Sequence, residues 1–149
     1  MKIFNYADLG SKRSWDYCMN GLTPEDDGIL PLIETDKEID IGYTLIISNV
    51  AYGVVSLSGK AGRYHTAFVS KLQSQEVFID GEEPEDKDYT GQITCPYCGY
   101  ENDDSWEADD DEDEYDCPRC GSVFSYQRNV TVEYCSQPVR KAEVVYLSL

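Results

Sequence analysis

Basic side chains are scarce in this chain of 149 residues. Lysine and arginine together number 12 against 29 aspartate and glutamate residues, which makes the formal net charge −17. Proteins that bind nucleic acid directly use lysine and arginine to neutralise phosphates. We therefore expect no direct binding of nucleic acid. An acidic surface instead favours a basic protein partner, including one that ordinarily holds nucleic acid.

Histidine is scarcer still, because His65 is its only representative. Histidine is the side chain whose ordinary pKa best suits proton transfer near neutral pH. No serine–histidine–aspartate set or cysteine–histidine pair stands out, and nothing singles out one pair of carboxylates. The stretch 59–62 lacks the spacing and the Lys-Ser/Thr ending of a phosphate-binding loop. The sequence therefore predicts a protein that is not an enzyme.

Long apolar runs are also missing. No stretch approaches the roughly 18 consecutive apolar residues that a membrane span requires. The first ten residues alternate apolar and charged side chains, unlike the apolar core of a signal peptide. Cysteines in such a chain are expected to be reduced, as in a cytoplasm. The predicted localisation is cytoplasmic.

What the chain does contain is a pair of nearly identical pentapeptides. Residues 95–99 read CPYCG and residues 117–121 read CPRCG, with 18 residues between the two CxxC pairs. This is the spacing of a two-knuckle zinc ribbon, in which a two-residue spacer lets two thiolates reach one ion from a single turn. The glycine closes that turn because it adopts φ > 0 without steric cost. The predicted zinc ligands are Cys95, Cys98, Cys117 and Cys120.

Two other interpretations of these cysteines fit less well. A single CxxC pair occurs in redox proteins, and four cysteines form disulfides in secreted chains, but two matched knuckles favour neither. Four cysteine ligands leave zinc no open coordination position, so the predicted ion is structural. Cys18 and Cys135 lie outside the knuckles, and we expect them to be ordinary buried or half-buried thiols.

The second half of the chain resembles a known group of proteins. Residues 89–138, about a third of the chain, are similar to the small zinc-ribbon proteins common in bacteriophage genomes. The resemblance rests on the two knuckles and on residues 99–101, 105–107, 123–126 and 129–134. It implies a phage origin, with the host bacterial cytoplasm as the place of action. It implies little about function, since such ribbons serve many roles.

Eleven acidic residues and no basic residue lie between the knuckles, in residues 101–116. A run of like charge is usually a solvated loop without regular structure. Two features favour a functional role instead: zinc would restrain both ends of the run, and Trp106 would supply an apolar anchor. Both interpretations stay open. The residues predicted to bind a basic partner are Asp109, Asp110, Asp111, Glu112, Asp113 and Glu114.

The first 88 residues predict a sheet with about one helix. Residues 11–21 have the pattern of a short helix with Trp15, Cys18 and Met19 on one face, and we expect Trp15 and Tyr17 in the core. Residues 23–31 are expected to form a loop. Strands are predicted over 39–47, 50–57, 63–72 (which also fits helical spacing) and 76–81, with a turn over 59–62.

A polar, proline-containing junction over 82–88 predicts two domains, 1–88 and 89–149. In the second domain, 123–127 and 130–135 are predicted to pair as strands. The apolar end, 143–149, is expected to dock as a strand on the first domain or on a second subunit, which allows a homo-oligomer. The predicted fold class is α+β and β-rich: a mainly antiparallel sheet domain followed by a four-cysteine zinc ribbon.

A metal-bound ribbon with dense negative charge predicts a non-enzymatic inhibitor. Carboxylates held in place can occupy an arginine- and lysine-lined groove that ordinarily holds nucleic acid. In architecture and charge the chain resembles zinc-containing anti-CRISPR proteins, which block single-protein, RNA-guided DNA nucleases whose heteroduplex channel is positively charged. No inhibitor motif matches residue by residue. The resemblance implies a phage inhibitor of host defence that blocks nucleic-acid loading or cleavage.

Two other classes of function stay open. Transcript-cleavage factors are zinc ribbons whose acidic hairpin tip helps to bind a metal ion in RNA polymerase, and residues 110–114 are candidates for that role. The run has more acids than such a tip needs, however, and no nearby basic residue. The remaining class is a phage structural or assembly component, in which zinc only stabilises a small domain.

We predict that the isolated protein does not bind duplex DNA. At a formal net charge of −17 the electrostatic free energy opposes association, and no basic stripe compensates for it. In a gel-shift assay at physiological salt the DNA should migrate unchanged. Micromolar affinity in that assay would contradict the prediction.

Overall fold

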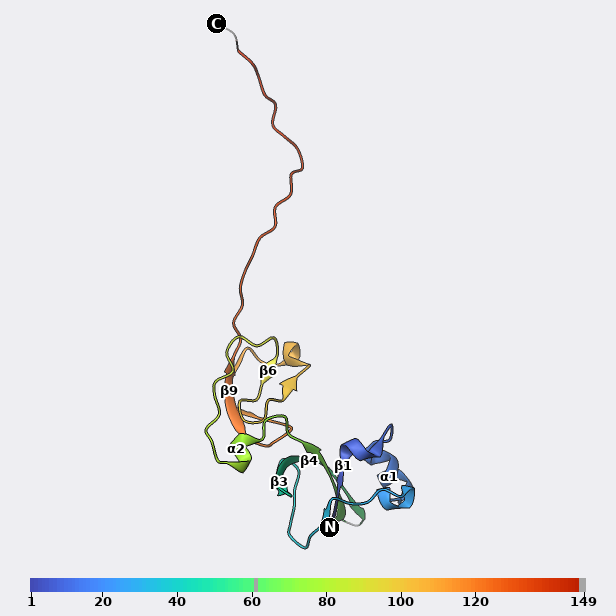
Figure 1. Ribbon diagram of the computed structural model, residues 1–149. Helices are drawn as coiled ribbons and strands as arrows, with labels where there is room; N and C mark the ends of the chain where they lie inside the picture. Colours follow the sequence, from blue (N-terminus) through green and yellow to red (C-terminus); the bar gives the residue numbers. More distant parts are fainter. Residues whose placement is uncertain (61, 148–149) are drawn as a thin grey trace.

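The fold is built on one five-stranded sheet, which carries a unit of two small hairpins at one end (Figure 1). The computed structural model describes residues 1–60 and 62–147. Strand β1 runs parallel to β5, and the other neighbouring strands are antiparallel. The strands, in the order in which they lie in the sheet, are β2 (Ile33–Glu34), β1 (Lys2–Asn5), β5 (Arg63–Lys71), β4 (Val50–Lys60) and β3 (Thr44–Ile47).

The long β4–β5 hairpin forms the centre of the core. Side chains alternate between its two faces, so Val54, Ala67 and Val69 pack on one face while Phe68 packs with Phe4 on the other. All five of these residues are fully buried. The predicted strands 50–57 and 63–72 are therefore confirmed. Gly59 and Lys60 belong to β4 instead of the predicted turn, and Ala61 lies outside the described residues.

Helix α1 (Ser14–Asn20) lies within the predicted range and ends at Gly21, which is left-handed with φ 66°. Its predicted core face is wrong. Trp15 and Met19 are 57% and 77% exposed, whereas Tyr17 is buried against Phe68 in the core. A helix of two turns buries only one narrow stripe of side chains. In α1 the buried side chain is that of Tyr17, which packs in the core. None of the helices among the described residues has the length and apolar composition needed to cross a bilayer.

Three further predictions for the first 88 residues need correction. Of the predicted strand 39–47, Thr44–Ile47 forms β3, and the two residues before it bond Val54 of β4 outside the regular strand. Part of the predicted loop 23–31 is the short 3-10 helix Pro24–Asp27. The predicted strand 76–81 is a helical turn, α2 (Glu76–Ile79). Its start is held by Gln75, whose side chain bonds the backbone N–H and C=O of Ala51 at 2.7 and 3.0 Å. These bonds hold the segment after β5 against the end of β4, which already lies between β3 and β5.

The hairpin unit contains the four knuckle cysteines and consists of two small hairpins. The first pairs β6 (Ile93–Thr94) with β7 (Glu101–Asn102), and the second pairs β8 (Asp111–Asp116) with β9 (Val123–Gln127). The predicted strand 123–127 is confirmed, but its partner is wrong. Strand β9 pairs with the acidic run instead of with residues 130–135. The protein is β-rich with few helices, as predicted.

Residues 128–147 form neither helix nor strand and leave the hairpin unit as an extended segment (Figure 1). The apolar side chains near the end are exposed, for example Tyr146 and Leu147, each at 90%. Docking of this segment on the first domain is therefore wrong for residues 143–147, and Ser148 and Leu149 lie outside the described residues. Its association with a second subunit stays a prediction.

The hairpin unit packs tightly on the sheet. Thr44 donates its hydroxyl hydrogen to the carbonyl of Cys120 at 3.0 Å, and the amide of Ser74 donates to the carbonyl of Cys98 at 3.0 Å. Glycine is required here: a Cβ on Gly53 would lie 1.9 Å from the carbonyl oxygen of Arg119. The division into 1–88 and 89–149 stays a prediction, and the two stretches share one packed junction.

We predict that Gly53→Ala destabilises the protein by about 1–3 kcal/mol, because the added methyl group displaces a backbone carbonyl that has no flexible atoms to yield. Thermal unfolding should show a melting temperature lower by roughly 2–4 °C for each kcal/mol. Gly91→Ala is the matched control, since a Cβ there meets nothing within 4 Å. Equal melting temperatures for the two variants would contradict the tight junction.

Candidate metal centre and acidic hairpin

The four knuckle cysteines converge on one point. Their sulfur atoms all lie within 4.8 Å of one another, with 3.7 Å between Cys95 and Cys120 and 3.6 Å between Cys98 and Cys117. Tetrahedral thiolates at about 2.3 Å from an ion are about 3.8 Å apart. Each of the four residues is at most 4% exposed. The donor set and its spacing fit a metal site, as the sequence predicted.

Each knuckle is the turn of its hairpin, and the two turns have the same hydrogen bonds. The amide of Gly99 donates to the carbonyl of Cys95, and that of Gly121 to the carbonyl of Cys117, both at 2.9 Å. Both glycines have positive φ, 82° and 77°. In the second knuckle the amide of Arg119 also donates to the sulfur of Cys117 at 3.4 Å. The local sequence therefore positions the sulfurs before tertiary packing contributes.

Four thiols at this separation share their protons unequally. Hydrogen bonds from Cys117, Cys95 and Cys98 lower the pKa of Cys120, whereas contact with Cys117 and then with Cys120 raises the pKa of Cys95 and of Cys98. Four neighbouring thiolates repel one another. A divalent cation at their centre would remove that repulsion and let all four ionise.

The surroundings of the sulfurs are apolar. Ala51 and Leu72 from the sheet are buried with them, and Phe78, Tyr100 and Phe124 pack around the cluster. The guanidinium of Arg119 lies over the ring of Tyr100, 5.1 Å from its centroid. Four sulfur ligands complete a tetrahedron, so an ion here has no free position for a substrate.

The other two cysteines are not buried, which corrects the prediction made for them. Cys18 lies on the solvent side of α1, and Cys135 lies in the extended C-terminal segment. Both are far from the knuckles in sequence and outside the cysteine cluster. They therefore serve as controls for substitutions of the four ligands.

The second half of the acidic run is a regular strand rather than a loop. Glu112 pairs with Tyr126 and Tyr115 pairs with Phe124, so Asp113 and Glu114 together face one residue of β9. This is a bulge of one extra residue. It keeps Glu112 and Tyr115 on the same, half-buried face although three positions separate them. The bulged acids are both exposed.

Aromatic rings support the hairpin from its inner face. The ring of Tyr115 lies 5.3 Å, centroid to centroid, from both Phe124 and Tyr126, with edge-to-face geometry. The hydroxyl of Tyr126 donates to the carbonyl of Asp109 at 2.8 Å. Desolvation, together with the neighbouring Asp109 carboxylate, raises the pKa of Glu112. Trp106, predicted as the apolar anchor of the run, is 73% exposed, and Tyr115 provides that anchor instead.

Arg128 ties the start of β8 to the turn before it. Its guanidinium lies 3.1 Å from the carboxylate of Asp110 and 3.3 Å from the carbonyl of Ser105, and its amide donates to the carbonyl of Asp110 at 2.7 Å. The six predicted partner-binding residues are thus brought together but are not equivalent. Asp110 is paired with Arg128 and Glu112 is half-buried. The exposed carboxylates belong to Asp109, Asp111, Asp113 and Glu114, and within residues 1–60 and 62–147 they form no ion pair.

Sequence reasoning missed the roles of Tyr115 and Arg128. A signal for Tyr115 was present, because it is the one aromatic residue among the acids from 107 to 116. Alternation of Phe124 and Tyr126 in β9 also requires an apolar face on the partner strand. Nothing in the sequence indicates that Arg128 pairs with Asp110, since that contact depends on the register of the hairpin.

We predict that Cys98→Ser or Cys117→Ser loses the bound metal and unfolds the hairpin unit, because structural zinc in small fingers contributes on the order of 10–16 kcal/mol of binding free energy. Cys18→Ser should retain the metal and the wild-type melting temperature, since Cys18 is exposed. Elemental analysis of each purified variant, with thermal unfolding, checks both statements. A full metal content in Cys98→Ser would refute the four-sulfur site.

The chain was also compared with known proteins. No family model, no curated protein and no solved structure matches it. The resemblance to phage zinc ribbons therefore rests on the knuckles and the residues around them.

Proposed function

We propose that the metal is zinc and that its role is structural. Four thiolates in a tetrahedron suit zinc, although iron also accepts such a site. A single ion held only by cysteines has no exchangeable ligand, and the apolar surroundings limit access of water. Elemental analysis distinguishes the two metals, and zinc at one ion per chain is the expected result.

We propose further that the protein is a non-enzymatic inhibitor that binds a basic, nucleic-acid-handling protein through its acidic hairpin. The observation that carries this proposal is the ordered β8 strand, which presents exposed carboxylates from a hairpin closed by the metal knuckle. Alternate residues of a strand repeat about 6.6 Å apart on one face. A row of carboxylates at fixed spacing binds guanidinium and ammonium groups with less loss of conformational freedom than a flexible acidic tail.

The proposed partner is an RNA-guided DNA nuclease of a bacterial host. Such nucleases hold the RNA–DNA heteroduplex in a positively charged channel, which an acidic protein is suited to occupy. The resemblance to phage zinc ribbons supplies the biological setting, in which a phage protein acts in the host cytoplasm against a defence enzyme. Occupation of the channel would block loading or cleavage of target DNA.

The acidic residues of a transcript-cleavage factor lie at a hairpin tip, and this arrangement differs. Here the tip of the β8–β9 hairpin is the second knuckle with Arg119, and the acids lie along the strand behind it. The geometry therefore favours binding along a surface over delivery of carboxylates into an active site. A role in the phage particle stays a possibility that a search for the protein in purified virions would test.

We predict that changing the six residues Asp109, Asp110, Asp111, Glu112, Asp113 and Glu114 to Asn or Gln slows association with the nuclease by roughly tenfold or more at low salt. Long-range attraction acts mainly on the association rate and is screened beyond a Debye length of about 8 Å at physiological ionic strength. Metal content should be unchanged, because none of the six is a ligand.

A charge-matched control has the same net charge as the hairpin variant but retains all the acidic residues of the hairpin. It neutralises six exposed acids of the first 88 residues, namely Asp8, Asp36, Glu38, Asp80, Glu82 and Glu83. This control should inhibit cleavage of target DNA as the wild type does. Full inhibition by the hairpin variant would show that the acidic strand only provides solubility.

A further inference from the structure

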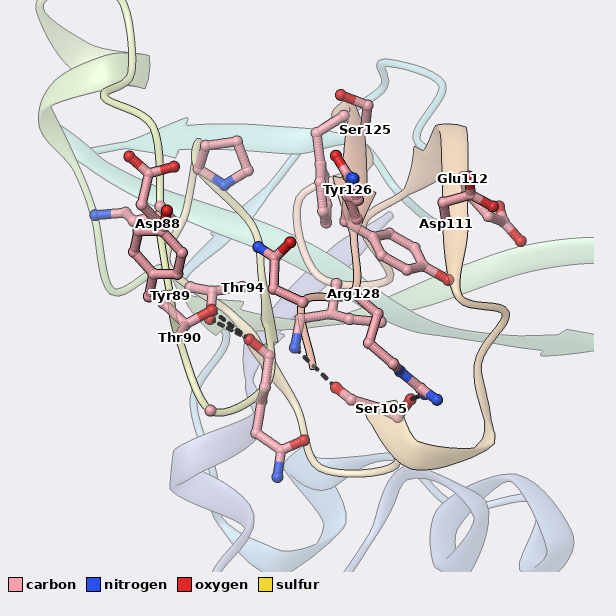
Figure 2. Close-up of a pocket in the computed structure, with 18 of the residues that line it drawn as sticks. Asp88, Tyr89, Thr90, Thr94, Ser105, Asp111, Glu112, Ser125, Tyr126 and Arg128 are labelled. Carbon is pink, nitrogen blue, oxygen red and sulfur yellow. Dashed lines mark hydrogen bonds between the residues drawn. The ribbon is translucent and has the colours of Figure 1, made fainter. Parts of the chain in front are cut away.

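An open groove lies between residues 86–94 and the β8–β9 hairpin, with a volume of about 1040 Å³. Figure 2 shows Asp88, Tyr89 and Thr90 on one side of it and Tyr126, Asp111 and Glu112 on the other, with Arg128 between them. The floor is formed by the turn at Ser105, whose hydroxyl accepts a hydrogen bond from the amide of Ile93 at 2.8 Å. The groove therefore joins the predicted domain junction to the acidic strand.

Both walls of the groove are acidic. Among the described residues that line it, Lys87 and Arg128 are the only basic ones, and the guanidinium of Arg128 is already engaged by Asp110 and Ser105. The carboxylates that line the groove are those of Asp86, Asp88, Asp109, Asp111, Glu112 and Asp113. A cationic group in the groove would thus meet carboxylates from two directions, which a flat acidic surface does not provide.

Exposed aromatic rings stand among these carboxylates. Tyr89 is 91% exposed and Trp106 is 73% exposed, and both line the groove, together with Tyr126. Tyr89 also has a left-handed backbone, with φ 55°, which is uncommon for an aromatic residue. Large exposed rings beside carboxylates suit a planar cation, because a guanidinium stacks on a ring while its N–H groups bond to carboxylate oxygens.

Arg128, which lines the groove, shows how a guanidinium is held at its edge. Arg128 reaches the carboxylate of Asp110 and the carbonyls of Ser105 and Ala108 with one side chain, at 3.1, 3.3 and 3.5 Å. Tyr89, Trp106 and the carboxylates of Asp88 and Asp111 line the same groove as Arg128. Arginine fits this site better than lysine, because the ammonium group of lysine is not planar and cannot form two parallel hydrogen bonds to one carboxylate.

We propose that this groove binds an extended, arginine-bearing segment of the partner protein, with its guanidinium groups between the two acidic walls and stacked on Tyr89 and Trp106. The proposal rests on the proposed function and adds the chemistry of the bound segment and a second wall, Asp86 and Asp88, that the acidic strand alone does not include. Charge complementarity selects the segment, since nucleic acid is repelled by the same carboxylates.

The test uses Trp106 as a reporter in the full-length, metal-loaded protein. The chain has two tryptophans, so Trp15→Phe, a change at an exposed position of α1, leaves Trp106 as the only one. The probe is a synthetic eight-residue peptide that alternates arginine and glycine. Saturable change of the Trp106 emission on titration is the expected result, and a peptide with glutamine in place of arginine should give none.

Variants of the wall opposite β8 locate the site. Asp86→Asn with Asp88→Asn, and separately Tyr89→Ala, should each weaken binding of the peptide by roughly tenfold. Asp8→Asn with Asp36→Asn is the charge-matched control and should bind as the parent does. All these positions are exposed, so metal content and melting temperature should stay unchanged and show that the fold is intact.

Each of three outcomes would overturn the inference. Equal affinity of the Asp86/Asp88 variant and its control for the peptide would show that the groove is not the binding site. The proposed function would still stand if neutralising the β8 carboxylates abolished partner binding. Equal affinity for a lysine peptide would exclude arginine selectivity. Tenfold tighter binding after Arg140→Gln with Lys141→Gln would show that the C-terminal segment of this chain, and not a partner, occupies the groove. Failure of the proposed function itself would appear as unimpaired nuclease inhibition by the six-residue hairpin variant.

Discussion

The convergence of four sulfur atoms is the constraint on which the rest of the structure depends. Two short hairpins, β6–β7 and β8–β9, have too few residues to form a core of their own. Their apolar centre is the cysteine cluster, extended by Ala51 and Leu72 from the sheet. A cation that joins the knuckles therefore fixes both hairpins relative to each other and to the end of β4. Small units of this kind ordinarily need such a staple.

The acidic strand is held in place by contacts that offset its dense charge. Repulsion among neighbouring carboxylates opposes an ordered strand, and exposed ion pairs offset it only weakly. Three features act against that repulsion here: the knuckle closes one end of the hairpin, Tyr115 packs on Phe124 and Tyr126, and Arg128 joins Asp110 to the preceding turn. The bulge at Asp113 and Glu114 then lets the inner face stay aromatic while the outer face stays acidic.

The packing of the hairpin unit on the sheet has a consequence for function. The backbone of Arg119 lies against Gly53, where a side chain would leave no room for it. A Cβ on Gly121 would likewise lie 2.0 Å from the carbonyl oxygen of Gly42. The second knuckle therefore contacts the backbone of the first 88 residues at two places. Contacts between backbones leave little freedom for the unit to rotate. The orientation of β8 is thereby set by the sheet. Under the proposed function, the N-terminal part of the chain would support the acidic hairpin.

The sequence alone determined the features that depend on local geometry. The knuckles, their glycine turns and the four candidate ligands follow from spacing within five residues. Strand β4 was predicted over 50–57, whereas residues 63–72 also fitted helical spacing, and pairing with β1 and β4 made them the strand β5. Tertiary structure decided everything that depends on distant pairing. Strand β9 pairs with the acidic β8 and not with residues 130–135. Helix α1 buries Tyr17 and leaves Trp15 exposed. Periodicity states that a segment has an apolar face; only contacts between residues far apart in the chain determine what covers that face.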